Sequence, residues 1–195
     1  MAYVRKVLEG KQPAIRDSPG ARSIDEIAPR HGPSSIEFRN VTFRYNEEGI
    51  EPGMEAEVPS VLRGISFRVL PGQNVALVGP SGSGKSTTLK LITRMLEPAT
   101  GEVLIDGCDV RNVTIESLRK RIAVVPQDTC LFDETIDYNI RYGNPNATHQ
   151  EIEAAIAQAN LRPTIEKFPL GLETNVGERG ARLSGGERQK VSIAR

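Results

Sequence analysis

The sequence is poor in the residue types that mark several classes of protein. Its 195 residues include no tryptophan and only two cysteines, and 25 lysine and arginine residues are balanced by 25 aspartate and glutamate residues. Cys108 and Cys130 lie far apart without CxxC spacing, which fits neither a zinc site nor a disulfide framework. The formal net charge of zero argues against a nucleic-acid partner, because such a partner calls for a strongly basic face.

Long apolar runs are also missing. No stretch approaches the roughly 18 consecutive apolar residues of a membrane-spanning helix. The first residues, MAYVRKVLEGKQP, have no apolar core of the kind that a secretory signal carries. The chain is nevertheless long enough to bury a core of its own, so we expect one globular domain, with or without an arm.

Composition changes along the chain. Over residues 1–35, proline and glycine interrupt a polar segment, which is the composition of a linker and not of a core. Alternating apolar residues then predict a strand over 36–45, with a bulge near Asn40 where the alternation changes phase, and a strand over 65–69. The acidic stretch 46–60 between them is expected to be an exposed loop.

The following apolar runs predict strands and helices around a glycine-rich loop. Residues 75–78 are continuously apolar, as is typical of a strand buried on both faces. We expect a helix over 85–96, strands over 103–105 and 122–125, and a short helix over 117–121. The residues of the first helix expected to face inward are Leu89, Ile92, Met95 and Leu96.

The strongest motif is this glycine-rich loop. Residues 79–86, Gly-Pro-Ser-Gly-Ser-Gly-Lys-Ser, match the pattern GxxxxGK[ST] in full. Glycines let the backbone fold closely around a phosphate so that N–H groups converge on its oxygens, and the following helix adds its positive dipole end. We expect Lys85 to reach the β- and γ-phosphates of a nucleotide and Ser86 to ligate Mg²⁺. The predicted nucleotide contacts here are Gly79, Pro80, Ser81, Gly82, Ser83, Gly84, Lys85, Ser86 and Thr87.

One segment imitates a second metal-binding element. Val103 to Asp106 is an apolar run followed by an acid, the pattern that holds Mg²⁺ in such enzymes. The run is short, however, and Asp106-Gly107 is a strong hairpin-turn pair. We therefore interpret it as a turn.

A second motif, Leu-Ser-Gly-Gly-Glu at 183–187, narrows the function. Alone, a serine before a helix is ordinary N-capping. Together with the phosphate loop it makes residues 36–195 resemble the ATP-binding cassette family, whose signature sequence is of the LSGGE type. Tyr45 stands where that family stacks an aromatic residue on adenine, Gln127 matches its glutamine loop, and residues 174–180 are similar to the loop that exporters place before the signature.

The resemblance implies a fold and a division into parts. The fold is α/β, a P-loop NTPase with an ABC-type ATPase core, an antiparallel β subdomain and a helical subdomain, incomplete at the C-terminus. Residues 1–35 would be the linker from an absent transmembrane domain, and 36–195 a partial nucleotide-binding domain. Its parts would be 36–127, the β subdomain and phosphate-loop core, then 128–183, the helical subdomain, and 184–195, the signature helix.

The resemblance also implies how these parts work. In the family two cassettes meet head to tail around ATP, so a homodimer of half-transporters joined to a transmembrane domain is expected. Ser184, Gly185 and Gly186 would contact the γ-phosphate, and Gln127 would ligate Mg²⁺ and touch the attacking water. Hydrolysis would weaken the dimer and so move the transported substrate. The catalytic set would be Lys85, Gln127, Ser184 and Gly186.

The sequence after the glutamine loop suggests a branch of the family. Residues 125–129, Val-Pro-Gln-Asp-Thr, and 138–144, Tyr-Asn-Ile-Arg-Tyr-Gly-Asn, are most similar to half-size exporters of the mitochondrial iron–sulfur and heavy-metal-tolerance branch. That branch implies the mitochondrial inner membrane or the vacuolar membrane. It also implies glutathione-linked compounds or heavy-metal conjugates as cargo.

The sequence departs from the family pattern at its end. It stops at Arg195, where the family continues into a strand with an Mg²⁺-holding Asp and a catalytic Glu, and neither His31 nor His149 stands where it could replace the switch histidine. We expect the chain alone to bind Mg-ATP weakly and to hydrolyse little or none of it. The phosphate-loop strand is expected to have an exposed edge.

Three functions are compatible with these features. They are the ATP-binding domain that drives a membrane exporter, a non-hydrolysing nucleotide-binding module or remnant, and a soluble cassette ATPase that acts on DNA or ribosomes. The loop at 174–180 and the linker at 1–35 favour the first, and the missing catalytic segment favours the second. The neutral charge disfavours the third.

Overall fold

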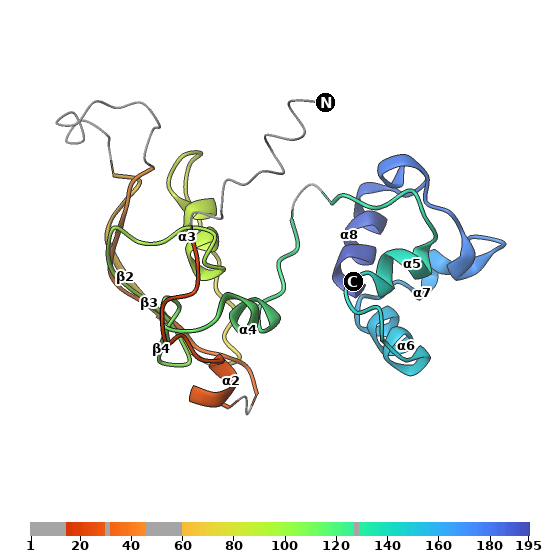
Figure 1. The fold of residues 1–195 in the computed structure, drawn as a ribbon. Helices are drawn as coiled ribbons and strands as arrows, with labels where there is room; N and C mark the ends of the chain where they lie inside the picture. The colour runs from red at the N-terminus through yellow and green to blue at the C-terminus, as the bar shows by residue number, and fades with distance from the viewer. Residues whose placement is uncertain (1–14, 30–31, 46–59, 127–128) are drawn as a thin grey trace, which may run out of the picture. The chain divides into compact units, whose positions relative to one another are not determined.

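The computed structural model describes residues 15–29, 32–45, 60–126 and 129–195. They form two compact units, Met1–Ala123 and Val124–Arg195, which are described separately below (Figure 1). No helix in these ranges is both long enough and apolar enough to cross a bilayer. The predicted boundary between the β and helical subdomains falls at residues 127–128, outside the described residues.

The first unit contains a four-stranded antiparallel sheet in the order β2-β1-β3-β4 (Figure 1). Its strands are β1 (Ile36–Phe43), β2 (Leu62–Val69), β3 (Thr100–Ile105) and β4 (Cys108–Asp109). Asp106 and Gly107, at φ 51° and 79°, form the turn between β3 and β4. The interpretation of Asp106-Gly107 as a hairpin turn is therefore confirmed.

The predicted bulge in β1 is also confirmed. The register with β2 shifts between Phe38 and Val41, and Asn40 has a left-handed φ of 47°. The shift lets Phe38 and Val41 both be buried, although they are three positions apart along the strand. The Asn40 N–H donates to the Ser66 hydroxyl at 2.8 Å, which gives the bulged backbone a partner on β2.

Helices α2 (Ile24–Ile27), α3 (Lys85–Ile92) and α4 (Ile115–Lys120) belong to the same unit. The core that they share with the sheet consists of Ile24, Phe38, Val41, Phe43, Leu62, Leu91, Val103, Ile105, Val110, Val113 and Leu118. Ile24 is fully buried in it, although the composition of residues 1–35 favours a linker. The helix predicted over 85–96 ends at Ile92, and its expected inward face is partly wrong, because Leu91 is buried while Leu89 and Met95 are more than half exposed.

Two predicted strands do not form. Residues 75–78 and 122–125 have no strand assignment, and Val75, Val78 and Val124 are exposed. An apolar run becomes a strand only where neighbouring backbone groups pair with it, and neither segment belongs to the sheet observed in the described residues. The prediction of a strand buried on both faces before the phosphate loop is therefore wrong for this structure.

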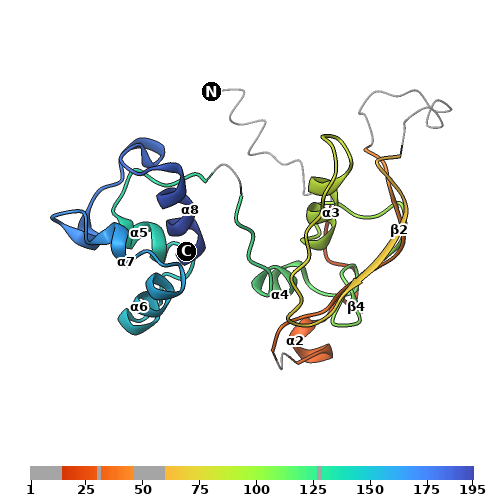
Figure 2. The same cartoon turned by 180° about the vertical axis from the view of Figure 1, so that it is seen from behind.

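The second unit is helical in its described part (Figure 2). It contains α5 (Ile136–Arg141), α6 (His149–Gln158), α7 (Arg162–Ile165), α8 (Gly185–Ala194) and two short 3-10 helices at Gly171–Glu173 and Glu178–Gly180. Its core residues are Leu131, Ile136, Ile140, Ile152, Ile156, Ala159, Leu161, Ile165, Val176, Leu183, Val191 and Ala194. The capping box predicted from Thr148 and Glu151 is present at the start of α6.

Candidate functional site

The phosphate loop leads directly into α3. Gly84 is the N-cap residue and has a left-handed φ of 91°. A Cβ atom at Gly84 would lie 2.6 Å from Leu62 Cδ2 on β2. Both the backbone conformation and the close packing against the sheet therefore require glycine at this position, and together they set where the helix begins.

Lys85 closes the phosphate loop on itself. Its Nζ donates to the carbonyl oxygens of Gly79 and Pro80, each at 2.7 Å, and to the Ser83 hydroxyl at 3.4 Å. The two short bonds hold the ammonium group over the loop. The long bond to Ser83 is the weakest of the three, so it is the one that a phosphate oxygen would most readily replace.

Tyr45 and the phosphate loop line one pocket of ≈ 570 Å³. The Tyr45 hydroxyl lies 3.1 Å from Thr87 Oγ1, and its ring meets Phe43 edge to face with the centroids 4.9 Å apart. These contacts fix an aromatic side chain that is 41% exposed beside the loop. The residues of this pocket are Tyr45, Val61, Ser81, Gly82, Ser83, Gly84, Lys85, Ser86 and Thr87.

The pocket suits an anion better than a cation. Lys85 is its one charged lining residue among the described part of the chain, and no carboxylate lines it there. Ser86, the second residue of α3, is exposed in the pocket, so its hydroxyl is accessible to an Mg²⁺ that arrives with phosphates. Within the described ranges, no group of three or more His, Cys, Asp or Glu side chains could hold a metal by itself.

The signature residues lie at the start of α8 in the second unit. Ser184 is the N-cap, and with Glu187 it forms a capping box. The Ser184 hydroxyl donates to Glu187 Oε2 at 2.8 Å and accepts from the Glu187 N–H at 3.3 Å. Ser184 is thus already bonded within the helix, whereas Gly185 and Gly186 present an exposed backbone.

The Glu187 carboxylate is strongly held. Bonds from the Ser184 backbone N–H, from Lys167 at 2.9 Å and from the Ser184 hydroxyl lower the pKa of Glu187 to about 2. Glu187 therefore stays ionised, and its charge stabilises the positive end of the α8 dipole. Sequence reasoning missed Lys167, because a lysine twenty residues before its partner gives no local signal.

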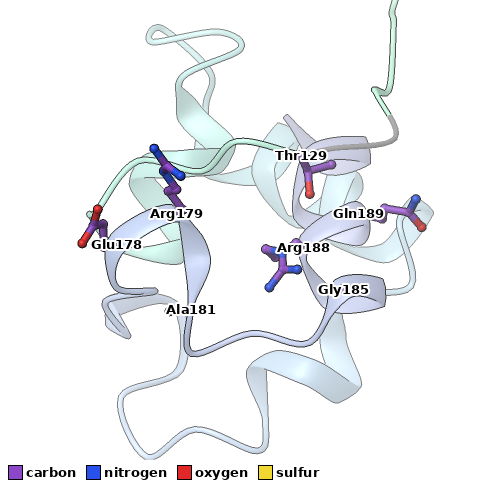
Figure 3. A pocket seen from close by; sticks show the side chains of 7 residues that line it. All are labelled: Thr129, Glu178, Arg179, Ala181, Gly185, Arg188 and Gln189. Atoms are coloured by element: carbon purple, nitrogen blue, oxygen red, sulfur yellow. The ribbon is translucent and has the colours of Figure 1, made fainter.

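A second pocket, of ≈ 490 Å³, lies beside the start of α8 (Figure 3). Figure 3 shows Arg188 in the middle of the residues that line it, with Gly185 nearby. A Cβ atom at Gly180 would lie 2.9 Å from Arg188 Cδ, so glycine lets the predicted exporter-type loop approach α8 closely. The lining residues are Thr129, Glu178, Arg179, Ala181, Gly185, Arg188 and Gln189.

The predicted site residues fall into two groups. Tyr45 and the phosphate loop come together in the first unit, and Ser184, Gly185 and Gly186 come together in the second. Gln127 lies outside the described residues, as does His31, and His149 is exposed at the start of α6. The catalytic and binding roles of all these residues stay predictions.

Comparisons with known proteins identify a matching family. A family model described as "ABC transporter" matches residues 62–195. The chain is 46% identical over 169 residues to the mitochondrial iron-sulfur clusters transporter ATM1 of Kluyveromyces lactis, and this match covers 87% of the chain and 22% of that protein. It is 48% identical over 181 residues to ATP-binding cassette sub-family B member 6 of Homo sapiens, and this match covers 93% of the chain and 20% of that protein.

A solved structure also matches the whole chain. It is that of a bacterial Atm1-family ABC exporter with ATP bound, and the match has a TM-score of 0.81 at 40% identity. The match covers 100% of this chain and 31% of that chain. The chain thus spans 20% to 22% of the two curated relatives named above and less than a third of the solved exporter.

Proposed function

Because the chain belongs to the ABC transporter family, we propose that it is the nucleotide-binding domain of an exporter and binds Mg-ATP at its phosphate loop. The predicted fold class and the resemblance to Atm1-type exporters are confirmed by the same matches. The observation that carries the proposal is the pocket in which Tyr45, Lys85 and Ser86 lie around one glycine-rich loop.

Each part of this pocket has a chemical task in the proposal. Backbone N–H groups of the loop and the positive end of the α3 dipole bind the phosphates, and Lys85 neutralises their charge. Tyr45 offers its ring face to the adenine, held in place by Thr87. Ser86 contributes a hydroxyl to Mg²⁺, which takes its remaining ligands from phosphates, water and Gln127.

The signature residues complete the site from a second copy. Gly185 and Gly186 present an exposed backbone at the start of α8, where a γ-phosphate oxygen would find N–H donors and the helix dipole. A two-fold dimer provides two such composite sites from one kind of chain. In the whole protein, we propose that ATP binding closes this dimer and hydrolysis opens it, which drives a transmembrane domain.

The relatives support a narrower assignment. Their printed names include a mitochondrial iron-sulfur clusters transporter, and the solved exporter is of the Atm1 family. We therefore propose that the parent protein is a half-transporter of this branch, acting at the mitochondrial inner membrane or the vacuolar membrane. Its cargo in this proposal is a glutathione-linked compound or a heavy-metal conjugate.

Nucleotide binding can be tested on the 195-residue chain with a fluorescent ATP analogue and Mg²⁺. Lys85→Ala should weaken binding at least tenfold, a loss of about 1.4 kcal/mol that suits the removal of a charge-assisted contact. Lys90→Ala is the matched control, because Lys90 is an exposed lysine on the same helix outside the pocket. Equal affinity for ATP in the two variants would overturn the proposed site.

A non-hydrolysing nucleotide-binding module is the second candidate function. It is favoured by the absence of a carboxylate or imidazole among the described residues that line the pocket, since water attack needs such a base or an orienting group. Phosphate release measured in the same samples tests this second candidate. Turnover of about 1 per second or faster, as in typical enzymes, would exclude this second function.

A further inference from the structure

Residues 15–29, here called the strap, are bonded along their length to the rest of the first unit. The Ser18 hydroxyl donates to the Arg111 carbonyl at 3.0 Å, and the Ile24 N–H donates to the Ser117 hydroxyl at 3.0 Å. Figure 2 shows α2, the helix of the strap, and α4, which contacts it, at the same end of the unit. The strap is therefore part of the packed structure in spite of its linker composition.

Arg94 joins the strap to the end of α3. Its side chain is 1% exposed, and its Nη2 donates to the Arg16 carbonyl at 2.8 Å. Its Nη1 donates to the Val113 carbonyl at 3.0 Å and lies 3.8 Å from Asp17 Oδ1. Its Nε donates to Glu97 Oε1 at 3.0 Å. One guanidinium group thus connects the strap, the segment before α4 and the segment after α3.

Arg94 is also tied to the phosphate loop by a short path. It directly follows Thr93, the C-cap residue of α3, and α3 begins with Lys85. The helix has 8 residues, so about 12 Å separates its two ends. Arg119 donates to the carbonyls of Thr93 and Arg94, each at 3.1 Å, and so fixes this end of the helix.

The chemistry of a buried guanidinium makes this connection stiff. Arginine cannot lose its proton in a protein, so a buried Arg94 must keep its acceptors or be left as an uncompensated charge. Its backbone also has a left-handed φ of 50°, which the surrounding contacts must hold in place. At the far end of the strap, Arg121 pairs with Asp25 at 2.7 Å and with Asp106 at 3.1 Å. Moving the strap therefore disturbs the end of α3.

We propose that Arg94 is a positioning residue that couples the strap to the phosphate loop. Nucleotide binding at the start of α3 stabilises the packed position of the strap. A force on the residues before the strap weakens nucleotide binding, because energetic coupling between two sites is reciprocal. The proposal rests on the proposed nucleotide site. It adds a physical connection, through the Arg94 side chain, between that site and the strap.

Hydrogen exchange of the strap amides in the 195-residue chain, with and without Mg-ATP, tests the coupling. In the wild type, ATP should slow exchange of the strap about fivefold, the lower end of typical coupling between sites. Arg94→Lys keeps the charge but loses the planar fork that reaches three segments. In this variant ATP should slow strap exchange by less than about twofold, and ATP should bind about fivefold more weakly.

Two further variants make the test specific. Asp17→Asn removes the charge that pairs with Arg94 but leaves the bond from Arg94 to the Arg16 carbonyl, so it should reduce the effect of ATP on strap exchange in part. It keeps an oxygen that can accept the bond that the Ile115 N–H donates to Asp17 Oδ1 at 2.8 Å, and it provides the test if Arg94→Lys does not fold. Arg39→Lys is the matched control, because Arg39 is an exposed arginine of β1 that pairs with Glu37. It should leave both readouts unchanged.

The outcomes separate this inference from the function on which it rests. If ATP binds the wild type but slows strap exchange equally in the wild type and the coupling variants, the coupling is wrong and the nucleotide site stands. If ATP does not bind the wild type, both proposals fail. A merely structural role of Arg94 would speed strap exchange by the same factor with and without ATP, and that result also overturns the coupling.

Discussion

Replacing Ser184 by alanine tests what the capping box contributes at the start of α8. The Ser184 hydroxyl bonds to both the N–H and the carboxylate of Glu187, and the variant loses both bonds. Loss of a serine N-cap costs about 1 kcal/mol, and loss of a bond to a charged group adds up to about 1 kcal/mol at this partly exposed position. We expect the free energy of unfolding to fall by about 1–2 kcal/mol at neutral pH.

The loss should depend on pH in a defined direction. The pKa of Glu187 is lowered from 4.5 to about 2 in the folded chain, so its ionised form stabilises the fold above pH 4.5 and this contribution disappears as the pH falls towards 2. The Ser184 hydroxyl is one cause of that lowered pKa. The difference between wild type and Ser184→Ala should therefore be largest above pH 4.5 and should shrink below it.

Urea unfolding at pH 7, 4.5 and 2 measures this difference. Ser192→Ala is the matched control, because Ser192 lies inside α8 away from the cap and alanine is the better helix former. It should be neutral or slightly stabilising at every pH. A Ser184→Ala variant as stable as the wild type at pH 7, or a loss that stays constant down to pH 2, would refute the reasoning.

Two further predictions concern the first unit. Ile24→Ala should lower the free energy of unfolding by about 2–5 kcal/mol, because it opens a cavity in the core. Ile27→Ala, on the exposed side of α2, should change the free energy of unfolding by less than about 0.5 kcal/mol. Equal values for the two variants in urea unfolding would show that the strap is not packed. Gly84→Ala should weaken ATP binding and destabilise the chain more than Gly82→Ala, since both glycines have left-handed φ but only at Gly84 would a Cβ atom meet Leu62. Calorimetric titration and urea unfolding of the two variants check this, and equal effects would exclude the role of the Leu62 contact.

Local sequence signals predicted local structure well. The change of phase at Asn40 located the bulge, Asp106-Gly107 located the turn, and Thr148 with Glu151 located the start of α6. In each case the physical cause lies within a few residues: a left-handed backbone or a side chain that bonds its own helix end. The glycine-rich loop belongs to the same class, because its shape follows from its own glycines and lysine.

Features that depend on distant partners could not be predicted in this way. Residues 75–78 have the composition of a central strand, yet a strand also needs neighbours to pair with. Ile24 is a single apolar residue in a polar segment, and only its contacts with α4 and the sheet show that it is buried. Arg94 appears in the sequence as one more charged residue, and its burial depends on acceptors from three separate segments.

The bonds that Lys85 makes within its own loop bear on the entropy of nucleotide association. Because its ammonium group holds the carbonyls of Gly79 and Pro80 together, the chain restricts the backbone of this loop when it folds and not when it meets its ligand. A preorganised loop loses less conformational freedom on binding, and so more of each phosphate contact appears as affinity. In the proposed site, Lys85 thus has two roles: it orders the backbone of the loop, and it neutralises the charge of the phosphates that the loop binds.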